Sequence, residues 1–193
     1  MISRSWHITV SDFSPGMVAQ ARQRLAALDR SWTSVQADVQ DLPFPDQSFD
    51  AVIANFMLYH VPDRPRAIAE IHRVLSTNGR FFAMTNGRSH MQEFHDLVNR
   101  VIPDTARDEE SGFSLENGEA QVAPWFDQIQ LVRYPDTLRV TEAEPLLGYI
   151  RSYAAGLGEA QETALRKRIE TELNAHGAFT ISKDPGMITG VKR

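Results

Sequence analysis

Short β-rich runs alternate with amphipathic helical segments through the first 102 residues of this 193-residue chain. The clearest strand is the apolar run at 51–54, which is typical of a strand buried on both faces of a parallel sheet. Other strands are predicted at 6–12, 33–37 and 80–85, and helices at 15–29, 64–75 and 90–102. This order favours an α/β fold with a mostly parallel sheet and helices on both faces.

The residues after 102 follow a different pattern. A polar segment at 103–120 predicts a loop. The β-rich segments beyond it come in two adjacent pairs, at 126–134 with 137–140 and at 179–183 with 187–192, and two helical segments separate the pairs. We therefore expect each pair to form a hairpin, which gives the sheet an antiparallel C-terminal hairpin.

Composition excludes several functional classes. The chain has no cysteine, which excludes disulfides, thiol nucleophiles and Cys-ligated metals and is typical of a reducing cytoplasm. Its net charge of −5 argues against a nucleic-acid partner. No apolar stretch suggests a membrane span or a secretory signal, so we expect a cytoplasmic protein without a membrane partner. His90 and His95 would point about 140° apart on a helix, and no metal site is expected.

Polar residues stand where three of the predicted strands end, which is where ligands bind in such sheets. Asp12 follows the first strand and can accept from both ribose hydroxyls, or it caps the next helix together with Ser14. Asp38 can accept from an adenine amino group, or it forms an Asx-turn. Asn55 offers a donor and an acceptor, or it is a turn residue. The pattern alone leaves these alternatives open.

Three segments together resemble the class I S-adenosylmethionine-dependent methyltransferases, in particular the type 11 small-molecule group. They are I-T-V-S-D-F-S-P-G-M at 8–17, A-D-V-Q-D-L-P-F-P-D-Q-S-F-D running into A-V-I-A-N-F-M-L-Y-H at 37–60, and A-E-I-H-R-V-L-S-T-N-G at 69–79. Each segment is weak alone, but their order and spacing are specific. The resemblance covers about residues 6–88 and is looser beyond.

The resemblance implies a Rossmann-like methyltransferase fold and S-adenosylmethionine as the cofactor. It implies a cofactor site in which Asp12 binds the ribose, Phe13 and Met17 lie beside the adenine, Asp38 and Val39 meet the adenine edge, and Asn55 and Phe56 stand near the methionine portion. It also implies one domain over 1–193, with a cofactor-binding half at 1–102 and the loop, edge hairpins and helices of 103–193 on the substrate side.

One element of the family pattern is missing. The family has a first strand followed by an acidic-Gly-x-Gly-x-Gly loop, and this chain begins at the family's second strand. In the family order 3-2-1-4-5-7-6 the absent strand is central. Exposed strand edges invite pairing with another chain. We therefore expect an N-terminally truncated chain that forms a homo-oligomer or a strand-sharing dimer.

The expected function is S-adenosylmethionine-dependent methyl transfer to an unidentified small molecule, compromised by the truncation. An oxygen or nitrogen acceptor needs a base, and His60 and His90 are weak candidates for it. Two alternatives stay open. One is a non-catalytic methyltransferase-like interaction module. The other is a different nucleotide-binding enzyme, which the missing G-x-G-x-x-G sequence disfavours.

Overall fold

The computed structural model describes residues 6–28, 32–102, 112–154 and 156–193. The first unit along the chain is a strand, a helix and a second strand. β1 (Ile8–Asp12) and β2 (Trp32–Gln36) pair in parallel as a separate two-stranded sheet, and α1 (Pro15–Ala26) connects them. The helix begins where the sequence predicts, because the Ser14 side chain accepts a hydrogen bond from Met17 N and a proline occupies the first turn.

The central sheet has the strand order β3-β4-β8-β5. Its members are β3 (Phe49–Asn55), β4 (Leu75–Asn86), β8 (Pro185–Lys192) and β5 (Phe126–Arg133). β3 and β4 are parallel, whereas β8 is antiparallel to both of its neighbours. The connection from β3 to β4 passes through η1 (Leu58–His60) and α2 (Arg64–Val74). Together with the β2-β1 pair, this is the order that the resemblance predicts without its central strand, and the fold class is confirmed.

The C-terminal strands pair differently from the prediction. β6 (Asp136–Val140) pairs with β7 (Phe179–Lys183) in a third sheet, while β5 pairs with β8, so neither predicted hairpin exists. Only Asp184 separates β7 from β8, and a single residue is too short for the two-residue turn of a tight hairpin. The chain therefore continues from β7 into β8 without reversing, and β5 continues into β6 in the same way. These two segments form an antiparallel ribbon that links the sheets, and in it Tyr134 N donates to Pro185 O at 2.8 Å.

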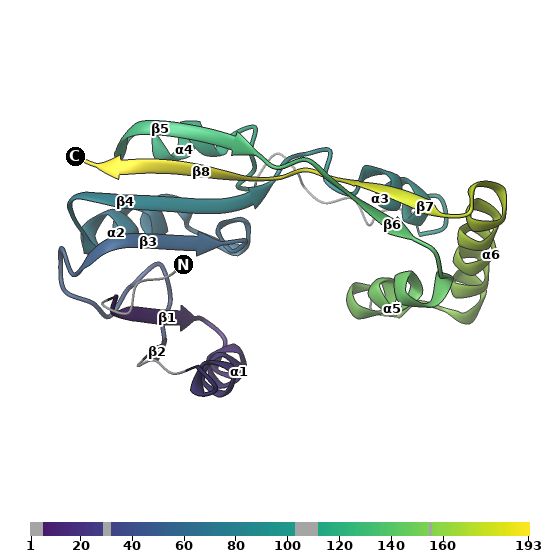
Figure 1. Ribbon diagram of the computed structural model, residues 1–193, viewed down its shortest axis with the longest axis horizontal. Helices are drawn as coiled ribbons and strands as arrows, with labels where there is room; N and C mark the ends of the chain where they lie inside the picture. Colours follow the sequence, from purple (N-terminus) through teal and green to yellow (C-terminus); the bar gives the residue numbers. More distant parts are fainter. Residues whose placement is uncertain (1–5, 29–31, 103–111, 155) are drawn as a thin grey trace.

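Two hydrophobic cores lie at opposite ends of this ribbon (Figure 1). In the first, α2 and α4 (Gly118–Val122) cover one face of the central sheet, and the rings of Phe81 and Phe126 stack with centroids 4.8 Å apart. The second core joins α3 (Gln92–Asn99), α5 (Ala143–Tyr153) and α6 (Glu159–His176) to the β6–β7 sheet. No helix among the described residues is both long and apolar enough to cross a membrane.

The apolar run at 51–54 is buried on one face only, which corrects the sequence prediction. Ala54 is buried against the first core, but the side chain of Ile53 on the other face is 63% exposed. Neighbouring strands place Phe82 and Thr189 beside Ile53 on this face, and both are only half-buried. The reason is that α2 and α4 both cover the opposite face.

Candidate functional site

The parallel strands bring two of the predicted site residues together. Asp12 is the last residue of β1, and its carbonyl accepts from Ala37 N of the segment leaving β2 at 3.1 Å. Asp38 therefore follows directly beside the carboxyl end of β1. Asn55 ends β3, which belongs to another sheet, and it pairs with Met84 of β4. The described residues thus place the two carboxylates at one sheet end and Asn55 at another.

The Asp12 side chain bonds to the turn that precedes the following helix, whose N-cap is Ser14. Asp12 Oδ1 accepts from Ser14 N at 2.8 Å. That bond uses one oxygen of the carboxylate, so it does not exclude a second role for the other oxygen. The adjacent Phe13 and Met17 side chains are 72% and 51% exposed, which is unusual for large apolar residues without a partner. Apolar surface of this kind beside a carboxylate is suited to an adenosine group.

Asp38 forms the Asx-turn that the sequence offered as its alternative role. Its Oδ1 accepts from Gln40 N at 2.8 Å, and the Gln40 side-chain Nε2 lies 3.1 and 3.2 Å from the two carboxylate oxygens. The bonds from the Gln40 backbone and side chain lower the pKa of Asp38 below its ordinary value, so the group is ionised at neutral pH. Val39 packs against the first core and anchors this turn.

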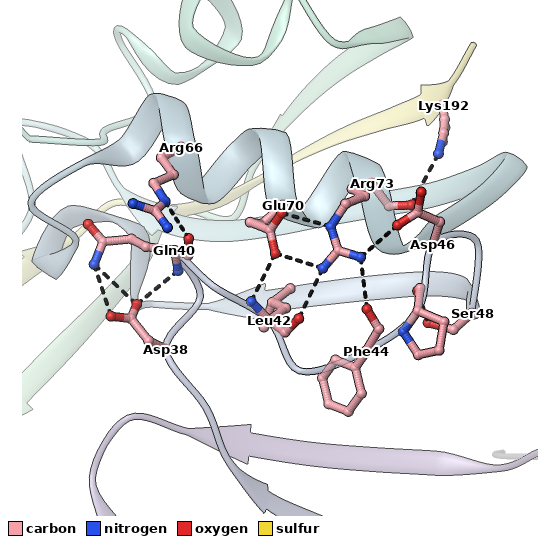
Figure 2. A network of polar contacts seen from close by, with 11 residues as sticks. Asp38, Gln40, Leu42, Phe44, Asp46, Ser48, Arg66, Glu70, Arg73 and Lys192 are labelled. Atoms are coloured by element: carbon pink, nitrogen blue, oxygen red, sulfur yellow. Dashed lines mark hydrogen bonds and ion pairs between the residues drawn. The ribbon is translucent and has the colours of Figure 1, made fainter.

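A network from α2 holds the loop that follows Asp38 (Figure 2). Glu70 accepts from Leu42 N at 2.9 Å, and Arg73 donates to the carbonyls of Leu42 and Phe44 at 2.9 and 2.8 Å. Arg73 also pairs with Glu70 at 2.7 Å and with Asp46 at 2.8 Å. The guanidinium bond lowers the pKa of Glu70, and the carboxylates raise the pKa of Arg73.

The same network fixes the turn at Asp38. Gln40 Oε1 accepts from Asp63 N at 2.9 Å, and Arg66 Nε donates to Gln40 O at 2.7 Å. The sequence motif at 69–79 contains Glu70 and Arg73, but no role is predicted for either residue from the sequence. The signal that was available is their i,i+3 spacing, which puts an acid and a base on one helix face. What they hold is a loop about 30 positions earlier, which helix spacing cannot reveal.

Phe56 adopts a strained backbone at the end of β3. Its φ is 48°, which is uncommon for a bulky residue, and its amide donates to Met84 O at 2.9 Å. The Phe56 side chain is 37% exposed. Such strain is often found at ligand sites, and here it changes the direction of the chain directly after Asn55.

The two candidate bases lie in different surroundings. His60 ends η1, and the centroid of its ring lies 4.4 Å from the centroid of the Tyr59 ring. His90 follows the carboxyl end of β4, and its Nδ1 accepts from Asp184 N at 3.1 Å. A neutral imidazole with Nδ1 as acceptor carries its proton on Nε2. To take a proton from a substrate, His90 would first have to give up the bond to the β7–β8 junction.

The described residues do not supply the glycine loop from another place in the chain. The sequence has one Gly-x-Gly, at Gly156 and Gly158, but it lies between the helices α5 and α6 and not after a strand. No group of three or more His, Asp or Glu side chains suited to a metal ion occurs within the described residues.

Comparison with known proteins gives a family match for the first part of the chain. The model of the methyltransferase domain family (Methyltransf_11) matches residues 1–83. The match covers less than half of the chain. This methyltransferase segment contains β1, α1, β2, β3, α2 and most of β4, and therefore Asp12, Asp38 and Asn55.

Curated relatives of the methyltransferase segment are quinone methyltransferases. The chain is 46% identical over 74 residues to a demethylmenaquinone methyltransferase of Clavibacter sepedonicus, a match to 38% of this chain and 30% of the relative. It is 38% identical over 124 residues to a 2-phytyl-1,4-naphtoquinone methyltransferase of Nostoc sp., a match to 62% and 53%. The chain thus spans about a third to a half of the length of these relatives.

Solved structures extend the likeness in fold to almost the whole chain. A putative methyltransferase of Bacillus halodurans superposes with a TM-score of 0.66 at 15% identity, over 97% of this chain and 83% of the other. A phosphoethanolamine N-methyltransferase of Haemonchus contortus, solved with S-adenosylhomocysteine, superposes with a TM-score of 0.53 at 18% identity, over 95% and 43%. At these identities the likeness concerns the fold, which is that of class I methyltransferases.

Proposed function

We propose that this chain binds S-adenosylmethionine at the carboxyl ends of β1 and β2 and takes part in methyl transfer to a small molecule. The observation that supports the proposal is the position of Asp12 at the carboxyl end of β1 and of Asp38 just beyond the adjacent β2, both within the segment that the family model matches. Ligands of parallel α/β sheets bind at this end of the strands.

The chemistry of the side chains suits the adenosine half of the cofactor. Ribose hydroxyls and the adenine amino group are donors, and Asp12 and Asp38 are acceptors. Asp38 is ionised because Gln40 holds its pKa down, and the exposed Phe13 and Met17 offer an apolar surface for the adenine ring. Toward the methionine half, Asn55 is the polar side chain placed at a strand end, and the strained Phe56 follows it.

The bound cofactor supplies an electrophilic methyl group on a sulfonium. The residues of this chain orient it: Asp12 holds the ribose, and the α2 network keeps the turn at Asp38 in place through Gln40, Glu70 and Arg73. The gain from such positioning is entropic, because it aligns the acceptor with the methyl group before reaction.

A quinone-like ring is the acceptor class that the relatives favour. Two curated relatives are named for demethylmenaquinone and for 2-phytyl-1,4-naphtoquinone. We place the acceptor side in the second half of the chain, 103–193, and the cofactor side in 1–102, within one domain. His60 and His90 remain the candidate bases, and the bond that His90 makes to Asp184 N disfavours His90.

Isothermal titration with S-adenosylhomocysteine tests the cofactor site. We expect wild-type protein to bind in the micromolar range and Asp12→Ala to bind at least about tenfold more weakly, because hydrogen bonds to a charged group contribute roughly 1.5–3 kcal/mol. Asp12→Asn is the matched control. It retains an oxygen that can accept from Ser14 N, and so it separates loss of the bond to Ser14 N from loss of the bond to the ligand.

The outcomes of this titration distinguish a cofactor site at Asp12 from a non-catalytic protein. Weak binding by Asp12→Asn at unchanged thermal stability supports a ligand role for the carboxylate. Equal binding by all three proteins would refute the site. No binding by any of them favours the second candidate function, a non-catalytic methyltransferase-like interaction module. That alternative is favoured by one observation, which is that β1 and β3 lie in separate sheets.

A further inference from the structure

The two hydrophobic cores share no residue, and three described connections run between them. They are the residues after β4, the step from β5 to β6, and the single residue between β7 and β8. Backbone bonds place them side by side, because Gly87 N donates to Asp184 O at 2.7 Å and Tyr134 N donates to Pro185 O at 2.8 Å. This junction, where the ribbon leaves the central sheet in Figure 1, sets the orientation of the second core.

The β-ladder of the ribbon is interrupted at the junction. The pairs between β5 and β8 end at Arg133 and Gly186, and the pairs between β6 and β7 begin at Asp136 and Lys183. Pro135 lies in the gap, and a proline has no N–H to donate to a ladder. A two-stranded β-structure is marginal in water without further strands or a packed face. The backbone alone is therefore a poor support for the second core.

A cluster of charged side chains joins the three connections. The guanidinium of Arg133 donates to Asp184 Oδ2 and, at 2.7 Å, to Glu116 Oε1. The second oxygen of Glu116 accepts from Arg88 N at 3.1 Å, and Glu116 itself follows Leu115, a buried residue of the first core. The side chains of Asp184 and Glu116 are 15% and 28% exposed, so water screens these pairs less than pairs on the open surface.

The backbone of the first connection lies close against the same cluster. A Cβ on Gly87 would collide with the Asp184 carboxylate and lie 2.7 Å from Arg133 Nη1, so a glycine is what allows this approach. Nearby, Glu93 of α3 accepts from Ser182 N at 2.8 Å and from Ser182 Oγ at 2.6 Å. None of these five residues belongs to either hydrophobic core, so polar contacts hold the junction.

We propose that Arg133, Glu116 and Asp184 form a latch that holds the second core in one orientation, and that opening the latch lets this core swing about the ribbon. The hinge is the interruption of the ladder. β3 and β4 both end on the side of the central sheet to which the second core is attached (Figure 1), so the swing changes the access to Asn55 and Asn86 at their ends. This inference rests on the junction and does not depend on the proposed methyltransferase function.

A pair of spin labels measures the orientation of the second core directly. The chain has no cysteine, so Glu119→Cys on α4 and Lys167→Cys on α6 place one label beside each core. Double electron–electron resonance then gives the distribution of distances between the labels. We expect one narrow distribution for the protein with an intact latch. Arg133→Met should broaden it and shift its mean, because both ion pairs of the latch are lost.

Arg151 provides the matched control. Its side chain is 40% exposed, as is that of Arg133, and it also pairs with two carboxylates, those of Glu144 and Glu162. These three residues lie on α5 and α6, so their pairs do not cross the junction. Arg151→Met should therefore leave the distance distribution unchanged.

Glu116→Gln is a second latch variant, which leaves Arg133 in place. Its amide retains an oxygen that can accept from Arg88 N but carries no charge for the guanidinium. Amide hydrogen exchange read by NMR should be about tenfold faster at Gly87 and Met91 in both latch variants, because the bonds of these two amides cross the junction.

The proposal is overturned if both latch variants keep the distance distribution and the exchange rates of the protein with an intact latch. It is also overturned if Arg151→Met broadens the distribution as much as Arg133→Met, because the loosening would then not be specific to the junction. A broader distribution in the latch variants alone, at an unchanged helix content by circular dichroism, supports it.

Discussion

At the scale of single residues, α2 organises the candidate site without being part of it. Glu70 and Arg73 bond to the backbone of the loop at 42–46, and Arg66 bonds to the turn at Gln40 (Figure 2). The Glu70 side chain is only 18% exposed, so these charge-assisted bonds are partly shielded from water. The loop that follows Asp38 therefore depends on side chains of a helix that begins 26 positions after Asp38.

This arrangement predicts a pH-dependent effect of Glu70→Gln. The folded protein lowers the pKa of Glu70 below 4.5, so its ionisation stabilises the fold fully above that pH and progressively less as pH falls through the folded pKa. We expect the variant to lose about 1–2 kcal/mol at pH 7. Urea unfolding of both proteins between pH 7 and pH 3 should show the difference shrink below pH 4.5. A difference that stays constant down to pH 3 would contradict the role of the charge.

At the scale of elements, close packing explains why β8 has a glycine at position 186. Gly186 lies opposite Arg133 where β5 ends, and a Cβ there would come within 2.7 Å of the Val132 carbonyl oxygen and 2.8 Å of the Leu115 side chain. Gly148, in contrast, lies within α5 and has open space around it. Steric crowding thus requires a glycine at position 186 of β8, whereas nothing around position 148 of α5 requires one.

Alanine at these two positions should act with opposite sign. Gly186→Ala forces a backbone shift and should destabilise the fold by about 1–3 kcal/mol. Gly148→Ala should stabilise it by about 0.5–1 kcal/mol, because alanine is preferred over glycine inside a helix. Thermal unfolding of the two variants against wild type measures both. Equal effects of the two changes would show that the contact at Gly186 does not constrain the chain.

At the scale of the whole molecule, the two cores are separated along the ribbon (Figure 1). The accessible surface of 12054 Å² exceeds the roughly 9,200 Å² expected for a compact protein of 21.7 kDa. The excess agrees with the exposed face at Ile53 and with the separate β1–β2 sheet.

Small-angle scattering should reveal this elongation. A compact chain of 193 residues has a radius of gyration of about 16 Å. We expect the monomer to give a clearly larger value, since the second core extends away from the central sheet. A measured radius near 16 Å for a monomer would mean that the two cores fold back onto each other in solution.

The local sequence determined the first half of the fold and the identities of the candidate ligands. Period-2 and period-3.6 patterns, the Ser14 cap and the apolar run at 51–54 are local signals, so β1, α1, β3 and α2 were predicted within a few residues. The methyltransferase resemblance rests on the same local segments and predicted the strand order.

Tertiary structure alone decided how the distant parts pair. The sequence placed β5 beside β6 and β7 beside β8, but β5 pairs with β8 and β6 with β7, because ladder formation depends on partners some 50 residues away. It also decided that Ile53 is exposed, since burial depends on what covers a face and not on the strand itself. Likewise, Glu70 and Arg73 hold the backbone at Leu42 and Phe44 across about 30 residues. Local propensity acts over a few neighbours along the chain, whereas these contacts exist only once the chain has folded.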